Sequence, residues 1–96
     1  MISKTILMER YFREGGMETF SDEEAVGLLL EMAGCPGDRD ILAGKLIERF
    51  GSLKGVLEAR EEQLRGVRGI GKRTSGVIRM VLPFCRKWEQ IGRAHV

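Results

Sequence analysis

The sequence lacks the residues that most enzymes, membrane proteins and disulfide-rich proteins need. Its one histidine, His95, lies near the C-terminal end, and its two cysteines, Cys35 and Cys85, are far apart. This set provides no catalytic base, nucleophile pair or zinc cluster, and we expect both thiols to be free. No apolar run reaches the ~18–20 residues that cross a bilayer, and no signal-peptide pattern is present. We therefore expect a cytoplasmic, non-catalytic protein without membrane contact, metal, cofactor or small-molecule substrate.

Proline and aromatic residues are also scarce, with two prolines and 6% aromatic residues in 96 residues. The β-branched and aromatic residues are too scattered for a sheet, whereas apolar residues recur at helical spacing along the chain. The length suits one small domain with a modest core. We predict a single all-α domain, residues 1–96, of about five to seven short helices.

Capping residues and glycines divide the first half of the chain into helices. The first helix is expected over residues 4–14, where Gly15-Gly16 ends it. Ser21 and Glu24 form a capping-box pattern that opens a very apolar second helix. Asp38 or Asp40 then caps a third helix. The apolar residues expected to be buried in these helices include Ile6, Leu7, Tyr11, Phe12, Val26, Leu28, Leu29, Leu30, Met32, Ile41, Leu42, Leu46, Ile47 and Phe50.

The second half should contain two short helices, residues 53–58 and 60–65, and a long helix over residues 72–89. Pro83 lies inside the long helix and should kink it, because proline cannot donate the backbone hydrogen bond. We expect Trp88 to pack against the first helix. Residues 92–96 are expected to form a disordered tail.

The segment Gly69-Ile70-Gly71 between the last two helices predicts a helix-hairpin-helix, a backbone device that holds a nucleic-acid phosphate. Two glycines supply the positive φ of a tight reversal, and Ile70 between them can point into the core. The helix that starts at Lys72 presents free N–H groups and its positive dipole end to solvent, and Lys72, Arg73 and Thr74 form its first turn. An anion is the expected ligand, although a tight helix connection that binds nothing has the same pattern.

Charge is unevenly distributed along the chain. The net charge of +2 combines −4 over residues 1–59 with +6 over residues 60–96. The basic half contains the glycine turn. A group of cations lies around this turn in the sequence and could extend a polyanion-binding face. These supporting residues are Arg65, Arg68 and Arg79.

A weak internal repeat relates residues 21–50 to residues 52–89. Each half pairs two helices through a glycine-containing turn, but Asp38 and Asp40 follow the first turn, whereas Lys72-Arg73 follow the second. Carboxylates beside a helix N-terminus repel phosphate and can themselves accept hydrogen bonds from the free N–H groups. We interpret residues 21–50 as a degenerate, structural hairpin and residues 52–89 as the functional one, which together make a tandem helix-hairpin-helix.

Four segments together resemble the N-terminal region of the RadC family, also named UPF0758 or DNA repair protein RadC. They are Phe20–Glu24, Leu28–Leu30, Leu46–Leu53 and Val67–Gly71, and the similarity spans about residues 5–90. The resemblance implies a DNA-associated role and a phosphate-binding role for Gly69, Ile70 and Gly71. In that family a JAB-type metalloprotease-like domain follows, and its His-x-His motif is absent here. Gly34-Cys35-Pro36-Gly37 departs from the family's usual Thr-Gly turn.

The sequence thus favours a sequence-independent DNA-binding module that contacts the backbone phosphates of duplex or branched DNA. Two alternatives stay open. One is a protein-protein interaction or dimerisation module, for which Met8, Met17 and Met32 would provide adaptable contacts. The other is the targeting region of a JAB-type metalloprotease-like protein whose catalytic domain is not in this chain.

Overall fold

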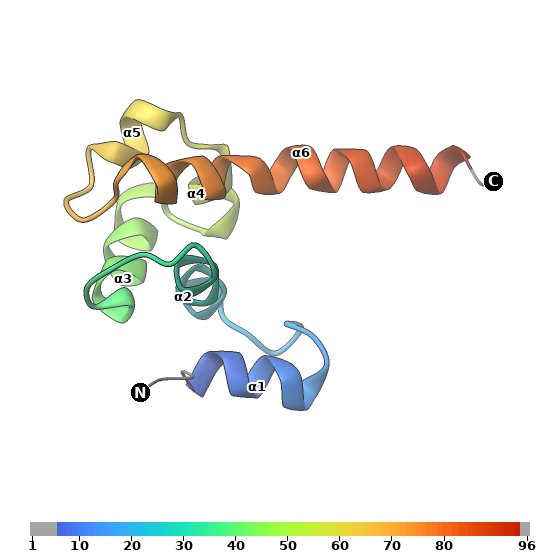
Figure 1. Cartoon of the computed structure of the whole chain (residues 1–96), viewed down its shortest axis with the longest axis horizontal. Coiled ribbons are helices and arrows are strands. Elements are labelled where there is room, and N and C mark those ends of the chain that lie inside the picture. Colours follow the sequence, from blue (N-terminus) through green and yellow to red (C-terminus); the bar gives the residue numbers. More distant parts are fainter. Residues whose placement is uncertain (1–5, 95–96) are drawn as a thin grey trace.

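Capping residues set the helix boundaries in the computed structural model, which describes the backbone of residues 6–94 and side chains as far as Ile91. Six helices and no strand form this part of the chain (Figure 1). They are α1 (Ile6–Glu14), α2 (Asp22–Met32), α3 (Arg39–Phe50), α4 (Leu53–Glu58), α5 (Glu61–Arg65) and α6 (Lys72–Ala94). The predicted all-α single domain of five to seven helices is confirmed.

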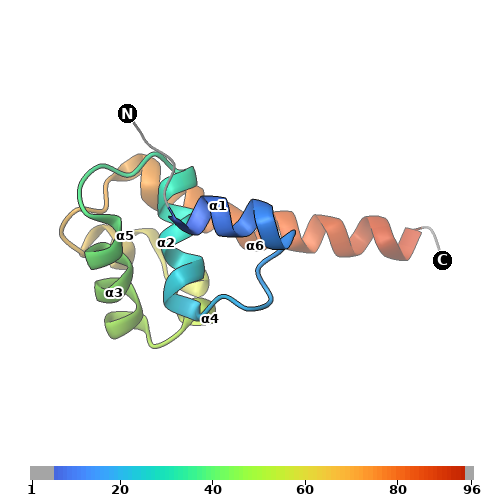
Figure 2. The same cartoon turned by 90° about the horizontal axis from the view of Figure 1, so that it is seen from below.

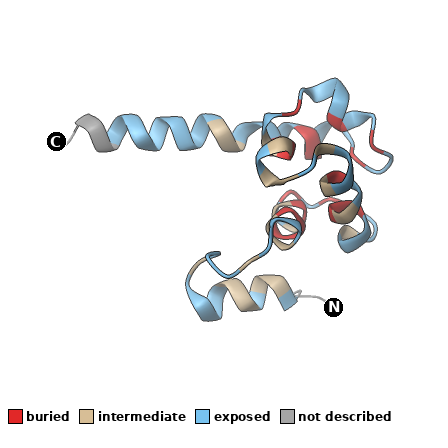
Figure 3. Cartoon of the chain, turned by 180° about the vertical axis from the view of Figure 1, so that it is seen from behind, coloured by how far each residue is buried: buried red, intermediate tan, exposed pale blue. Residues whose placement is uncertain are grey.

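The core lies where α2 and α3 pack against α4, α5 and the first turns of α6. Figure 3 shows the buried residues gathered at this junction. Apolar side chains from all five helices and from both glycine-containing turns meet there: Val26, Leu30, Cys35, Leu42, Leu46, Val56, Leu64, Ile70 and Ile78. Both helix pairs of the predicted repeat therefore share one core.

The N-terminal helix α1 packs on the outside of α2. Its Leu7 approaches Gly27, where an added Cβ would lie 3.1 Å from Leu7 Cδ1. Arg10 donates hydrogen bonds to Glu24 Oε2 at 3.0 Å and to the Thr19 carbonyl oxygen at 2.7 Å. Because only one side of α1 meets α2, Phe12 is exposed, contrary to the sequence prediction, and Ile6 at the start of the helix is exposed as well.

Glu24 joins α1 to the capped start of α2. Its Oε1 accepts a hydrogen bond from the Ser21 N–H at 2.9 Å, and its own N–H donates to Ser21 Oγ at 3.1 Å. The predicted capping box is therefore present. Two groups hold the pKa of the Glu24 carboxyl below its ordinary value of 4.5. The hydrogen bond from the Ser21 N–H has the larger effect on this pKa, and the Arg10 guanidinium has a smaller one.

Two predicted core residues, Met32 and Ile41, are exposed instead. Met32 occupies the last position of α2, and the buried neighbours that hold this helix end in the core are Leu30 and Ala33. Ile41 lies in the first turn of α3, whose buried face consists of Leu42, Ala43 and Leu46. Apolar identity at a helix end did not decide burial in either case.

The long helix α6 extends further than predicted, to Ala94 instead of residue 89. It runs straight out of the domain in both views (Figures 1 and 2), although Pro83 lies inside it and was expected to kink it. Residues 92–94 are helical, which corrects the predicted tail, and residues 95–96 lie outside the described residues. Trp88 is 73% exposed, so the prediction that it packs against α1 was wrong.

The course of α6 stays straight although Pro83 lies inside it. Pro83 has no N–H, so the carbonyl of Arg79 loses its helical hydrogen bond, but the first turns of α6 are held by the bond from Arg79 Nη1 to the Ala59 carbonyl oxygen and the helix continues to Ala94. No helix within residues 6–94 is both long and apolar enough to cross a membrane.

Candidate nucleic-acid interface

Gly69 makes the reversal that precedes α6, and the structure gives two reasons why this residue is glycine. Its φ is +102°, a conformation that residues with side chains rarely adopt. A Cβ at this position would also lie 2.9 Å from Leu42 Cδ2 on α3. Ile70 next to it is 5% exposed and belongs to the core, as predicted. The turn is thus fixed by backbone conformation and by its apolar anchor.

Gly71 serves a different purpose, and the prediction that both glycines supply positive φ was wrong for it. Gly71 does not have positive φ, and its carbonyl accepts the first helical hydrogen bond of α6, from Ser75 N at 2.9 Å. A Cβ added there would have no heavy atom within 4 Å. Glycine at this position therefore leaves open space at the N-terminus of α6.

The first turn of α6 is not capped by any side chain of the described residues, whereas those of α2, α3 and α4 are. Ser21 Oγ, Asp38 Oδ1 and Ser52 Oγ accept N–H groups in the first turns of those three helices at 3.1–3.2 Å. The first turn of α6 contains no acidic residue. Its free N–H groups therefore present partial positive charge that no side chain of the described residues neutralises.

The two glycine-containing turns lie beside each other and line a shallow hollow of about 470 Å³. Gly34 and Pro36 from the first turn form one side, and residues 69–74 form the rest. The buried thiol of Cys35 lies 3.7 Å from the Gly69 carbonyl oxygen, and Arg73 Nε donates to the Ala33 carbonyl oxygen at 3.1 Å. The first turn thus supports the second. The two contacts join residues that are separated by 34 and by 40 positions in the chain, and the sequence did not reveal them.

All five predicted basic residues are exposed, but they differ in whether they are bonded to another part of the domain. Arg68 and Lys72 are exposed and have no ion-pair partner among the described residues. Arg73 binds the first turn, and Arg79 Nη1 donates to the Ala59 carbonyl oxygen at 3.0 Å, which fastens α6 to the end of α4. Arg65 pairs with the carboxylate at position 61 on its own helix, at 3.8 Å.

Thr74, which was predicted to join the phosphate site, has little access to solvent. Its residue is 4% exposed, although it borders the hollow between the two turns. Its backbone N–H belongs to the uncapped first turn of α6. The Thr74 side chain is therefore largely withdrawn from solvent.

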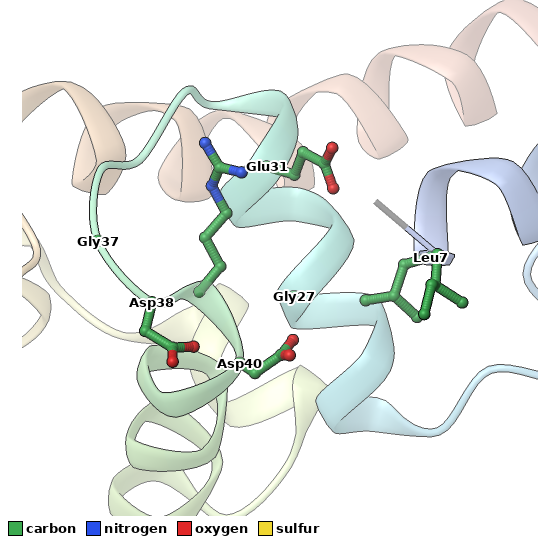
Figure 4. Close-up of a pocket in the computed structure, with 8 residues that line it drawn as sticks. Leu7, Gly27, Glu31, Gly37, Asp38 and Asp40 are labelled. Carbon is green, nitrogen blue, oxygen red and sulfur yellow. The ribbon is translucent and has the colours of Figure 1, made fainter. Parts of the chain in front are cut away.

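A second hollow, of about 450 Å³, lies between α1, α2 and the start of α3 (Figure 4). Leu7 and Gly27 line one side, and Glu31, Asp38 and Asp40 bring carboxylates to it. Within residues 6–94 no group of three or more histidine, cysteine or acidic side chains is placed to hold a metal ion. Arg39 also lines this hollow, and its Nε donates to the Cys35 carbonyl oxygen at 2.8 Å. Three carboxylates thus outnumber one guanidinium, and the excess of negative charge disfavours a phosphate.

The fold therefore places two glycine-turn helix pairs in one small all-α domain. No protein-family model matches the chain, and no solved structure shows significant similarity to it. Curated proteins do match. The chain is 40% identical over 73 residues to UPF0758 proteins of Burkholderia thailandensis and Burkholderia mallei, and 32% identical over 72 residues to one of Desulforudis audaxviator.

Each of these similarities includes 75% of the chain but only 26–31% of the length of the relative. They confirm the resemblance to the RadC family that the sequence motifs indicated: the chain is homologous to UPF0758 proteins over three quarters of its length.

Proposed function

We propose that this domain is a non-catalytic module that binds the phosphate backbone of DNA through the start of α6. The observation that carries the proposal is the uncapped first turn of this helix beside Lys72, in a domain where α2, α3 and α4 are each capped by a side chain. The excess of basic residues after position 59 supports it.

In this proposal one phosphate occupies the hollow between the two turns. The backbone N–H groups of Lys72, Arg73 and Thr74 donate to its oxygens, and the missing side chain of Gly71 permits close approach. The Lys72 ammonium neutralises the phosphate, and Arg68 contacts a neighbouring one. Arg73 acts chiefly by holding the first turn in place.

Contacts of this kind do not read the base sequence, because backbone phosphates are alike at every position. With about two or three phosphates neutralised, affinity should fall roughly 10- to 40-fold between 50 and 200 mM salt. The RadC name of the homologous family motivates including branched DNA, the substrate class of many repair proteins, among the ligands tested.

The test measures binding of a labelled duplex and a three-way junction at about 50 and 200 mM salt. The Gly71→Ala, Lys72→Glu variant should lose binding and keep its helicity, because position 71 has room for a methyl group and Lys72 is exposed. The matched control is Gly44→Ala, Lys54→Glu, which makes the same two changes on α3 and α4. Equal binding by both variants would reject the site.

A second candidate function, a protein-interaction module, is favoured by a different observation. Met17 and Met32 are exposed, but they lie singly. The outer part of α6 instead presents several large apolar side chains together, and these could form the surface that a partner covers.

A further inference from the structure

Four large apolar side chains form an exposed row along the outer part of α6, which we call the α6 stripe. They are Met80, Phe84, Trp88 and Ile91, with exposed fractions of 51%, 69%, 73% and 44%. Spacings of four, four and three residues place them within an arc of about 80° on one side of the helix. A contiguous apolar patch of this size is comparable to the largest one on a typical monomer, and such patches are often functional.

The α6 stripe does not belong to the core of the domain. Thr74, Ser75 and Ile78 are the buried residues of α6, and all lie in its first two turns. Beyond them the helix leaves the domain, and Figure 3 shows its outer half exposed. The fold itself therefore offers these four side chains no cover.

The charged side chains of α6 are distributed in a way that favours a protein partner. Arg79 and Arg86, seven residues apart, lie more than about 110° around the helix from the centre of the stripe. In a helix that lies on a membrane, basic side chains usually flank the apolar face and reach the lipid headgroups. Here only Lys87 borders the stripe, so a lipid surface is a poorer match than another apolar helix.

We propose that the α6 stripe is the self-association surface of this chain, on which the same stripe of a second copy packs. The four side chains expose roughly 500 Å² per copy, so pairing two copies buries at most about 1,000 Å² in total, a size that suits a weak, concentration-dependent dimer. A two-fold pair satisfies both stripes at once and leaves the α6 N-terminus of each copy open.

The two helices pair in antiparallel orientation and cross near Phe84 and Trp88. A parallel pair would bring the two Lys87 side chains together across the seam, and like charges that face each other repel. The antiparallel pair separates them and aligns the two helix dipoles favourably. It also places the two domains at opposite ends of the helix pair.

Trp88 is the only tryptophan of the chain, so its fluorescence reports directly on the stripe. The experiment combines sedimentation equilibrium with Trp88 emission over protein concentrations from about 5 to 500 μM, a range suited to an interface of this small size. We expect a monomer–dimer equilibrium, with emission moving to shorter wavelength as the dimer forms. Trp88→Glu should raise the dimer dissociation constant at least about 30-fold, as expected for a central aromatic anchor.

The matched control is Gln90→Glu, which adds the same charge two residues away on the opposite side of α6 and should leave dimerisation unchanged. Both positions are exposed, so at protein concentrations where the wild type is monomeric both variants should show its circular dichroism and melting temperature. A purely monomeric wild type with constant emission overturns the proposal. So does a dimer that survives Trp88→Glu, or a monomer whose emission shifts only when anionic phospholipid vesicles are added.

Discussion

The two glycine-containing turns of this domain occupy corresponding places but end in opposite electrostatic states. After the first turn, Asp38 caps α3 by accepting the Ile41 N–H at 3.2 Å, and Asp40 adds a second carboxylate. After the second turn, α6 has no side-chain cap among the described residues, and two cations stand in its first turn. A helix end that supplies its own anion has no need of an external one.

The comparison also shows that one repeat can serve as the support of the other. Residues of the first turn line the hollow before α6, and Arg73 crosses from the second turn to the Ala33 carbonyl oxygen. The first turn, which is followed by a helix with its own aspartate cap, therefore has a structural role in holding the second. The following changes test how far the two turns differ.

The largest expected effect comes from Gly69→Ala, because it tests the reversal itself. Positive φ and the approach of the Leu42 side chain should together cost about 2–4 kcal/mol of stability. Urea denaturation followed by circular dichroism measures this cost. Gly71→Ala is the control and should cost less than about 1 kcal/mol. Similar losses in the two variants would contradict the different roles assigned to the two glycines.

Replacing the two adjacent cations should separate support from binding. Arg73→Ala removes the bond to the Ala33 carbonyl and should lower the free energy of unfolding by about 1–2 kcal/mol. Lys72→Ala should leave stability within about 0.5 kcal/mol and lower DNA affinity by several fold. Thermal melts and binding isotherms are compared for both variants. If Lys72→Ala were the less stable protein, the assignment would be reversed.

Gly71→Asp would make the second turn resemble the first. An aspartate at this position can cap α6, and φ there is not positive, so stability should rise by about 0.5 kcal/mol. DNA binding should fall at least about 10-fold at about 50 mM salt, because the carboxylate competes with phosphate for the same N–H groups. Gly71→Ser, a neutral cap, serves as the control for charge. Unchanged DNA affinity in the Gly71→Asp variant would argue against phosphate at this helix end.

The smallest expected effect is on the pH dependence of stability. A titrating carboxylate, that of Glu24, helps to cap α2, whereas the first turn of α6 has no such group. The folded pKa of Glu24 lies below its ordinary value of 4.5, so its ionised form stabilises the fold above that pH. This contribution should be lost as the pH falls through the folded pKa. The measurement is the melting temperature from about pH 7 to about pH 3, for the wild type and for Glu24→Gln. Below the ordinary pKa of 4.5, the melting temperature of Glu24→Gln should decline less steeply than that of the wild type.

Local sequence signals predicted most of the helix boundaries. Ser21, Asp38 and Ser52 each stand one residue before a helix, where their side chains accept the N–H groups that helix geometry leaves unpaired. The glycine turn and its anchor Ile70 were predicted for the same reason, because the required φ and the apolar side chain are properties of a few adjacent residues. These features depend on interactions within one or two turns of chain.

Other predictions failed where packing at a distance decides. Trp88 and Phe12 are apolar residues on amphipathic helices, but no element of the described residues covers them. Both glycines of the turn look alike in sequence, and only the approach of Leu42 and the backbone φ values distinguish Gly69 from Gly71. Arg73 looks like a phosphate ligand in the sequence, whereas its bond to the Ala33 carbonyl, forty residues away, gives it a supporting role.

The sequence by itself determined the all-α class, the capped helix starts and the position of the glycine turn, because each follows from hydrogen bonding and backbone conformation over neighbouring residues. Tertiary structure alone decided that the two turns lie together, that Arg73 and Arg79 bond to distant carbonyl oxygens, and that the outer half of α6 stands free. These features depend on how whole helices pack, because side chains far apart in sequence compete for places in the same core. A local sequence pattern does not predict the outcome.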